Sequence, residues 1–305
     1  MKVLVAGATG AVGVPSVRAL LAAGHEVVGT TRSEKKRGLI EAMGATSIVM
    51  DALDAASARR AVTETRPDAI AQLLTDLPKR GPVRSSELAT TNRLRIDGTR
   101  NLVAAAREAN VGRYVSESIA LGYMPSSERP ATETDPFADE AARPSFAGPL
   151  RALAFLDEEV RGIGGIVLRM GLYYGDESGS QQFMAKLARR RLLMMPKGNG
   201  LLPWVHVEDV ASAVVAALER GKPGEAYNIV GDEPATTFDL ASAVARSVGS
   251  RSPRKMPRWL VRLALPYLAS TLDQSYLVSN EKAKRDLGWT PRYPRVEDAF
   301  RVAAG

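Results

Sequence analysis

Three glycines at three-residue intervals are the first residues whose spacing suggests chemistry. Gly7, Gly10 and Gly13 follow a short apolar run, residues 2–6, and precede a helical pattern that continues to Leu21. The first glycine permits a tight turn, the second lets a pyrophosphate approach the backbone, and the third lets the helix pack closely on the strand. The N–H groups at a helix N-terminus attract phosphate. The stretch therefore predicts a dinucleotide site, the alternative being an ordinary glycine-rich turn.

This Gly-x-x-Gly-x-x-Gly spacing resembles the short-chain dehydrogenase/reductase superfamily, in particular its extended and atypical, epimerase/dehydratase-like branches. Other stretches carry the same resemblance over nearly the whole chain: 97–102, 168–175, 205–211, 227–229 and 287–291. The resemblance implies an α/β fold, a Rossmann-like doubly wound parallel sheet with a smaller C-terminal substrate lobe. It also implies a nicotinamide cofactor, which we expect to contact Gly7, Thr9, Gly10, Ala11, Val12, Gly13, Thr31, Arg32, Lys36, Asp51, Ala52, Leu73 and Leu74.

The end of the second predicted strand indicates which nicotinamide cofactor is used. In NAD-selective proteins of this kind an acid stands here and binds the ribose hydroxyls. This chain has Thr31 followed by Arg32, with Lys36 nearby. A guanidinium can bind a 2′-phosphate with two hydrogen bonds, whereas a carboxylate would repel it. We therefore expect NADP(H), unless Arg32 only stacks on adenine.

The catalytic residues of the superfamily are missing. The resemblance implies a serine that orients the carbonyl, a tyrosine that protonates it and a lysine that lowers the tyrosine pKa. The corresponding positions hold Ile119, Leu150 and Ala154, and residues 146–154 contain neither tyrosine nor lysine. The usual proton donor is therefore absent.

Three functions remain open after this departure. The first is an NADPH-dependent ketoreductase acting on a bulky, largely apolar, polyketide-like ketone, with the proton coming from substrate, water or a substitute side chain. With this first function the protein would resemble the atypical, angucycline-type ketoreductases of aromatic polyketide and antibiotic biosynthesis. The second is a non-catalytic NADP-binding sensor or regulator. The third, a sugar-nucleotide epimerase or dehydratase, depends most on the missing tyrosine.

Substitute catalytic and substrate-binding residues can be named from their places after predicted strands. Ser118, Tyr123 and Tyr173 are candidate catalytic residues, although each could instead have a structural role. Flexible thioethers suit a large apolar ligand. The residues expected to border the substrate are Ser116, Met124, Met170, Met194 and Trp204.

The elements that must position these residues alternate regularly. Apolar runs near residues 2–6, 27–31, 46–50, 69–74, 113–115 and 165–169 predict strands separated by helices. This order predicts a parallel sheet with right-handed crossovers. Residues 1–175 are expected to form the NADP-binding Rossmann domain, joined by segments near 201–230, and 176–305 to form mainly the substrate-binding lobe.

Composition excludes several other classes. The 305 residues include no cysteine, so disulfides and zinc–thiolate sites are excluded, and with two histidines no metal site is expected. We expect no membrane span, because no apolar run of about eighteen residues occurs, and a cytoplasmic location. A net charge of +7 is spread along the chain without a nucleic-acid-binding motif. The expected partner is a small-molecule substrate, with the chain a monomer or homodimer.

Overall fold

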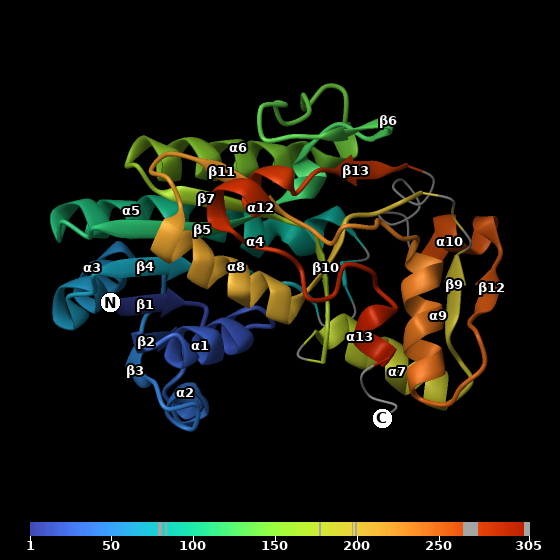
Figure 1. Cartoon of the computed structure of the whole chain (residues 1–305), viewed down its shortest axis with the longest axis horizontal. Coiled ribbons are helices and arrows are strands. Elements are labelled where there is room, and N and C mark those ends of the chain that lie inside the picture. The colour runs from blue at the N-terminus through green and yellow to red at the C-terminus, as the bar shows by residue number, and fades with distance from the viewer. Residues whose placement is uncertain are drawn as a thin grey trace.

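A seven-stranded parallel sheet forms the centre of the molecule (Figure 1), with the strand order β11-β7-β5-β4-β1-β2-β3. The computed structural model describes residues 1–78, 81–82, 84–176, 178–196, 198, 200–264 and 274–301. The strands of this sheet are β1 (Lys2–Ala6), β2 (Glu26–Thr31), β3 (Thr46–Val49), β4 (Ala69–Gln72), β5 (Arg113–Ile119), β7 (Ile166–Met170) and β11 (Ala226–Ile229). The predicted Rossmann-like α/β fold is confirmed.

Helices cover both faces of the sheet, which explains why its strands are apolar without strict alternation. One face packs on α3 (Ala55–Thr65), α5 (Thr99–Glu108) and α6 (Ala147–Gly162). The other face packs on α1 (Gly13–Ala22), α2 (Arg37–Glu41), α8 (Val207–Arg220) and α12 (Glu281–Leu287). Each face therefore has its own apolar core.

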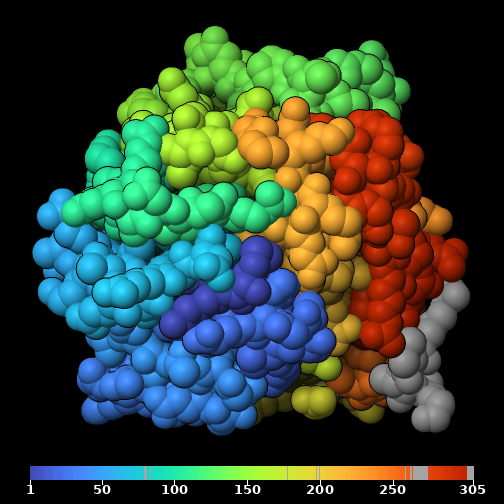
Figure 2. Space-filling model, turned by 60° about the vertical axis from the view of Figure 1, so that its left-hand side comes forward, coloured from blue at the N-terminus to red at the C-terminus, as the bar shows by residue number. Residues whose placement is uncertain are grey.

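The chain returns to the sheet after β7. Strand β11 pairs with β7, and helix α8 packs against α1. In Figure 2 the orange segments of α8 and β11 lie beside the blue N-terminal elements and the red C-terminal ones. A separate group of elements lies to one side in Figure 1: α7 (Gly179–Arg189), β9 (Met194–Pro196), α9 (Thr237–Ser247), β12 (Arg254–Met256) and α10 (Arg258–Ala264).

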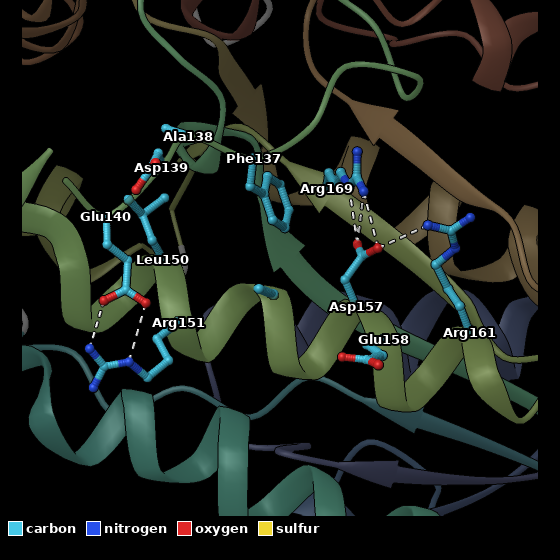
Figure 3. Close-up of a pocket in the computed structure, with 11 residues that line it drawn as sticks. Phe137, Ala138, Asp139, Glu140, Leu150, Arg151, Asp157, Glu158, Arg161 and Arg169 are labelled. Atoms are coloured by element: carbon cyan, nitrogen blue, oxygen red, sulfur yellow. Dashed lines mark hydrogen bonds and ion pairs between the residues drawn. The ribbon is translucent and has the colours of Figure 1, made fainter. Parts of the chain in front are cut away.

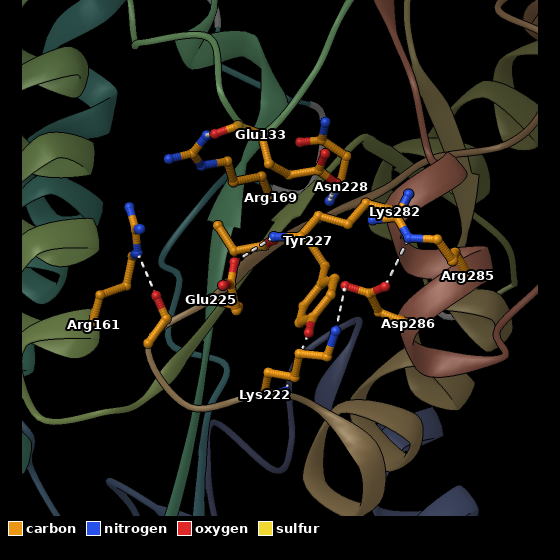
Figure 4. Close-up of polar contacts among 12 residues, drawn as sticks. Glu133, Arg161, Arg169, Lys222, Glu225, Tyr227, Asn228, Lys282, Arg285 and Asp286 are labelled. Carbon is orange, nitrogen blue, oxygen red and sulfur yellow. Dashed lines mark hydrogen bonds and ion pairs between the residues drawn. The ribbon is translucent and has the colours of Figure 1, made fainter.

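Polar contacts fix β11 at the edge of the sheet (Figure 4). The Asn228 backbone N–H donates to Glu133 Oε1 at 2.8 Å, which ties the long loop before α6 to this strand. The Lys282 ammonium of α12 pairs with Glu225 at 2.6 Å, just before the strand. The return strand is thus held by segments far from it in the sequence.

The region between β5 and α6 differs from expectation. Residues 124–149 are rich in Pro, Ser, Glu and Asp, a composition that predicts a loop, but they contain β6 (Ser126–Ala131), which pairs with β13 (Tyr276–Val278). Such a distant partner leaves no local pattern. A further small pair joins β8 (Leu172–Tyr174) to β10 (Trp204–His206).

The sequence predicts one long helix near residues 94–110, but the helical segment there has a more complex form. Helix α4 (Ala89–Arg93) precedes it, and residues 94–98 are π-helical before α5 begins at Thr99. A further short helix, α13, spans Asp298–Arg301. Within the described residues, no helix combines the length and apolar character needed to span a membrane.

Candidate active site

The glycine turn between β1 and α1 has a shape that side chains would not allow. Gly7 has φ +94°, and a Cβ there would lie 2.4 Å from the Leu73 carbonyl oxygen. A Cβ on Gly13 would lie 2.0 Å from the Gly7 oxygen. Gly10 is exposed, and apart from its two chain neighbours the only described atom within 4 Å of its ideal Cβ is that same Gly7 oxygen, at 3.2 Å. The turn is therefore tightly packed on the protein side and open where a phosphate would approach.

The N-terminus of α1 is available to an anion. Among the described residues, no side chain caps this ten-residue helix, whose N-cap is Val12. By contrast, Asp54 caps α3 and Thr236 caps α9. Since the N-terminal N–H groups carry a partial positive charge, phosphate oxygens can take the place of the missing cap.

The predicted adenosine end of the site lies along the same edge of the sheet. Thr31 ends β2, and the next side chain, Arg32, is 60% exposed and 3.9 Å from Asp76. Lys36 is also exposed. At this distance the ion pair with Asp76 is weak, so the guanidinium remains accessible.

The other predicted cofactor residues follow β3 and β4 along this edge. The Asp51 carboxylate accepts the Leu53 backbone N–H at 3.0 Å, and Ala52 is buried beside it. Leu73 is buried against the glycine turn, and Leu74 is half-buried. The fold therefore brings the predicted cofactor residues to one edge of the sheet.

The positions of the missing catalytic residues lie in apolar surroundings. Ile119 and Leu150 belong to one apolar cluster, which also includes Leu153, and Leu150 is 2% exposed. Ala154 is exposed and lines the same cavity as Leu150. Another register, in which both positions are buried, pairs Pro149 with Leu153. A Tyr–Lys pair is therefore missing in either register.

The Tyr123 hydroxyl is engaged by two partners inside the protein. Its side chain is buried, and its hydroxyl donates to Asn228 Oδ1 and accepts from Arg169 Nη1, both at 2.8 Å. Burial raises the pKa of Tyr123 to about 12. With both hydrogen-bonding directions used inside the protein, this hydroxyl has little left to offer a substrate.

The two candidate serines are inaccessible. Ser116 is fully buried and its hydroxyl donates to the Glu117 carbonyl at 3.2 Å. Ser118 is also fully buried, and its Oγ has no hydrogen-bond partner among the described residues. Neither side chain is in a position to orient a substrate carbonyl in this structure.

Tyr173 is in a different environment. It is partly buried, and its hydroxyl donates to Glu117 Oε2 at 2.8 Å and lies 3.1 Å from the Met170 sulfur. The other Glu117 oxygen, Oε1, is 3.4 Å from Arg95 Nη2. Sequence reasoning did not identify Glu117 or Arg95. An acid between two serines near the end of a predicted strand was the available signal.

The expected substrate residues are dispersed. Met170 is fully buried beside Tyr173, and Trp204 is buried with its indole N–H donating to the Ala235 carbonyl. Met124 and Met194 are exposed. The structure therefore leaves the first two as packing residues and only the last two open to a ligand.

A charged cavity of about 550 Å³ opens beside α6 (Figure 3). Leu150 and Phe137 form apolar parts of its wall, and the ion pair between Asp157 and Arg169 lies at one end. Arg169 faces α6, whereas the next residue, Met170, packs toward α1 and α8. The cavity and the Tyr173 hydroxyl thus lie toward opposite faces of the sheet.

Comparison with known proteins assigns the family. The sequence model for the NAD dependent epimerase/dehydratase family matches residues 3–230. This chain belongs to the NAD dependent epimerase/dehydratase family. A 3-diazoavenalumate denitrifying reductase from a Streptomyces species is 34% identical, the alignment covering 98% of this chain and 99% of the relative.

Two further similarities extend over the whole chain. A 2-alkyl-3-oxoalkanoate reductase from Stenotrophomonas maltophilia is 26% identical, with 100% of this chain and 99% of the relative covered. The crystal structure of a Thermus thermophilus UDP-glucose 4-epimerase in complex with NAD has a TM-score of 0.78 and 25% identity over 99% of both chains. The chain is thus an oxidoreductase, a reductase of the epimerase/dehydratase family.

The acidic and histidine side chains at the start of α8 accept hydrogen bonds from backbone N–H groups. The described part of the chain contains no group of three or more His, Cys, Asp or Glu side chains that could hold a metal ion. Asp209 and His206 near the start of α8 are used structurally. Asp209 accepts the backbone N–H groups of Arg292 and Tyr293, and His206 accepts that of Glu208.

Proposed function

We propose that this chain is an NADPH-dependent ketoreductase acting on a bulky, largely apolar, polyketide-like ketone. One observation carries the proposal: the glycine turn and the α1 N-terminus are intact, while Ile119 and Leu150 pack in an apolar cluster where the family has its proton-handling residues. A nucleotide-binding turn beside an apolar wall favours hydride transfer to a substrate that is bound mainly through apolar contacts.

The chain's own residues would hold the cofactor at the edge of the sheet. The backbone from Gly7 to Gly13 would bind the pyrophosphate, and Asp51 the adenine amino group. The exposed guanidinium of Arg32 would bind the 2′-phosphate, supported by Lys36. When bound, NADPH supplies a hydride.

The substrate would lie between this edge and residues 176–305, excluding α8 and β11, which we propose as the substrate lobe. Exposed Met124 and Met194 offer adaptable apolar contacts there. The Stenotrophomonas relative is named for a 3-oxo substrate, which supports a ketone. Sugar-nucleotide epimerisation fits less well, because the described face of α6 that packs on the sheet carries no tyrosine or lysine.

A second candidate function is the reduction of an aromatic diazo compound. The 34% identical Streptomyces relative, which aligns over nearly its full length, is named as a denitrifying reductase of 3-diazoavenalumate, a diazo compound. Replacement of a diazonium group by hydride releases N₂ and consumes no proton, whereas ketone reduction consumes one. A site without the Tyr–Lys pair suits such a reaction.

The test is NADPH oxidation with three substrate panels: polycyclic aromatic ketones, 2-alkyl-3-oxo acids and aryl diazonium salts. NADPH binding is titrated alongside. Turnover of either ketone panel supports the proposal, whereas turnover of diazonium salts alone selects the second function. Tight NADPH binding with no oxidation in any panel would overturn both and favour a sensor or regulator.

A further inference from the structure

We propose that Glu117 is the proton source for carbonyl reduction and that Tyr173 passes its proton to the substrate oxygen. This inference rests on the proposed ketone reduction. It assigns catalytic work to a buried acid and a tyrosine outside the usual triad positions. Arg95 acts as a positioning residue behind them.

The three side chains come from separate elements that meet at the carboxyl edge of the sheet. Glu117 lies in β5, Tyr173 in β8, and Arg95 in the π-helical segment before α5. Tyr173 Oη is 2.8 Å from Glu117 Oε2, and Arg95 Nη2 is 3.4 Å from Oε1. Each carboxylate oxygen therefore has its own described partner.

The position of Glu117 along β5 agrees with a role beside the cofactor. Ser116 of β5 pairs with Gln72, the last residue of β4. Leu73, which follows Gln72, lies against Gly7. Glu117 pairs with Leu168 in β7, whose side chain packs toward α1 and α8. The acid is thus near the strand ends on the face that carries the glycine turn and α1.

Exposure distinguishes the members of this group. Arg95 and Glu117 are 6% and 4% exposed, whereas Tyr173 is partly exposed. Only the tyrosine is therefore placed to contact a substrate, and the acid behind it must act through the tyrosine hydroxyl.

The protonation state of Glu117 decides where the Tyr173 proton points. An ionised Glu117 accepts the tyrosine O–H, as seen here, and so keeps that proton away from a ligand. A carboxyl group protonated on Oε2 can instead donate to Tyr173 Oη, since a phenol oxygen both donates and accepts. The tyrosine proton is then free to bind a carbonyl oxygen.

The electrostatics of the site favour a stored proton. Burial raises the pKa of Glu117, and the opposing effects of the Arg95 charge and the Tyr173 hydrogen bond do not cancel it. Burial and the neighbouring Glu117 charge raise the pKa of Tyr173, which disfavours its loss of a proton without replacement. Arg95 and Tyr173 are the charged and titratable groups that face Glu117 among the described residues.

One hydride transfer and two proton transfers make up the reduction step. The carbonyl carbon accepts the hydride, and the carbonyl oxygen takes the Tyr173 proton as the C=O π bond becomes a C–O single bond. Tyr173 takes the Glu117 proton at the same time, so the tyrosine ends neutral and Glu117 ends as a carboxylate facing Arg95. Solvent restores the proton on Glu117, and the net reaction consumes one hydride and one proton.

The kinetic test uses Glu117→Gln and Tyr173→Phe with a ketone that the wild type reduces. Removing a general acid is expected to lower kcat on the order of 10²–10⁴-fold. NADPH affinity should be unchanged, and the wild-type loss of kcat with rising pH should disappear in Glu117→Gln. Tyr174→Phe is the matched control, because its hydroxyl bonds the Arg295 carbonyl outside this group.

A second measurement needs no substrate or cofactor. Infrared spectra of the wild type from roughly pH 5 to roughly pH 9 should show a protonated carboxyl band that titrates above the ordinary glutamate pKa and is missing in Glu117→Gln. Absence of that band in the wild type, or an unchanged kcat–pH profile in Glu117→Gln, would overturn the relay while leaving ketone reduction intact. A wild type that reduces no ketone would instead overturn the proposed function.

Discussion

Ile119 and Leu150 share one apolar cluster, although the first ends a strand and the second lies in the first turn of a helix thirty-one positions later. In relatives with the usual triad, the resemblance places a serine and a tyrosine here. Apolar side chains that pack against each other have replaced both the serine and the tyrosine. The loss of these two catalytic residues therefore involves the packing of the core and is more than a surface substitution.

The double variant Leu150→Tyr/Ala154→Lys is expected to gain no ketone turnover. Leu150 is buried, so a tyrosine there overfills the cluster and buries a hydroxyl, at a cost of about 1–3 kcal/mol. Ala154 lines the cavity, so a lysine there enters a site that already holds the Asp157–Arg169 ion pair. Turnover and urea unfolding are measured together, and a gain of activity without loss of stability would contradict this reading of α6.

Gly13→Ala should destabilise the protein and abolish NADPH binding. The added Cβ would lie 2.0 Å from the Gly7 oxygen, so the turn must open. We expect a loss of more than about 2 kcal/mol in the free energy of unfolding. The control is Gly162→Ala at the end of α6, where nothing described lies within 4 Å of the new Cβ. Equal unfolding and binding in the two variants would be incompatible with this packing.

Arg32→Ala should weaken NADPH binding while leaving NADH binding nearly unchanged. Loss of a charge-assisted contact to phosphate costs about 1.5–3 kcal/mol, or roughly 10–100-fold in Kd. Arg59→Ala serves as the control, because Arg59 is an exposed arginine that pairs with Glu108 on the surface. If Arg32→Ala weakened both cofactors to the same extent, the 2′-phosphate assignment would fail.

Tyr123→Phe should lower stability and spare catalysis. The change removes the hydroxyl that connects Arg169 to Asn228, and buried polar groups that lose a partner cost about 1–3 kcal/mol. Thermal unfolding should therefore begin at a lower temperature, with kcat unchanged while the variant is folded. A large fall in kcat at full folding would restore Tyr123 as a catalytic candidate.

Asp209 should make stability depend on pH in an unusual direction. Burial raises its pKa from 3.8 to about 6, although two backbone N–H groups oppose the shift. Because the folded state holds this proton more tightly than the unfolded state, its contribution is present below about pH 4 and is lost as pH rises through about 6. The contribution is at most about 3 kcal/mol.

Comparison with Asp209→Asn isolates this effect, since the amide does not titrate. As the pH rises from roughly 4 to roughly 6, the wild type should lose stability relative to the variant in urea unfolding. Parallel stability curves across that range would show that the Asp209 pKa is not raised in the folded protein.

The sequence by itself determined the cofactor-binding half of this protein. Gly7, Gly10 and Gly13 act within one strand–turn–helix unit, so their spacing already specifies the local geometry. The buried parallel strands were also readable, because each carries its own apolar run. The absence of the Tyr–Lys pair was evident from residue types alone. Which residues of α6 are buried was not evident from the sequence.

Only the tertiary structure decided which polar side chains could do chemistry. Tyr123 and Tyr173 have the same functional group, but Asn228 and Arg169 hold the first, while Glu117 and the edge of the sheet surround the second. Those partners are distant along the chain, and their contacts follow from strand order and side-chain direction. A proton donor is defined by burial and neighbours, and these arise only when the elements pack together.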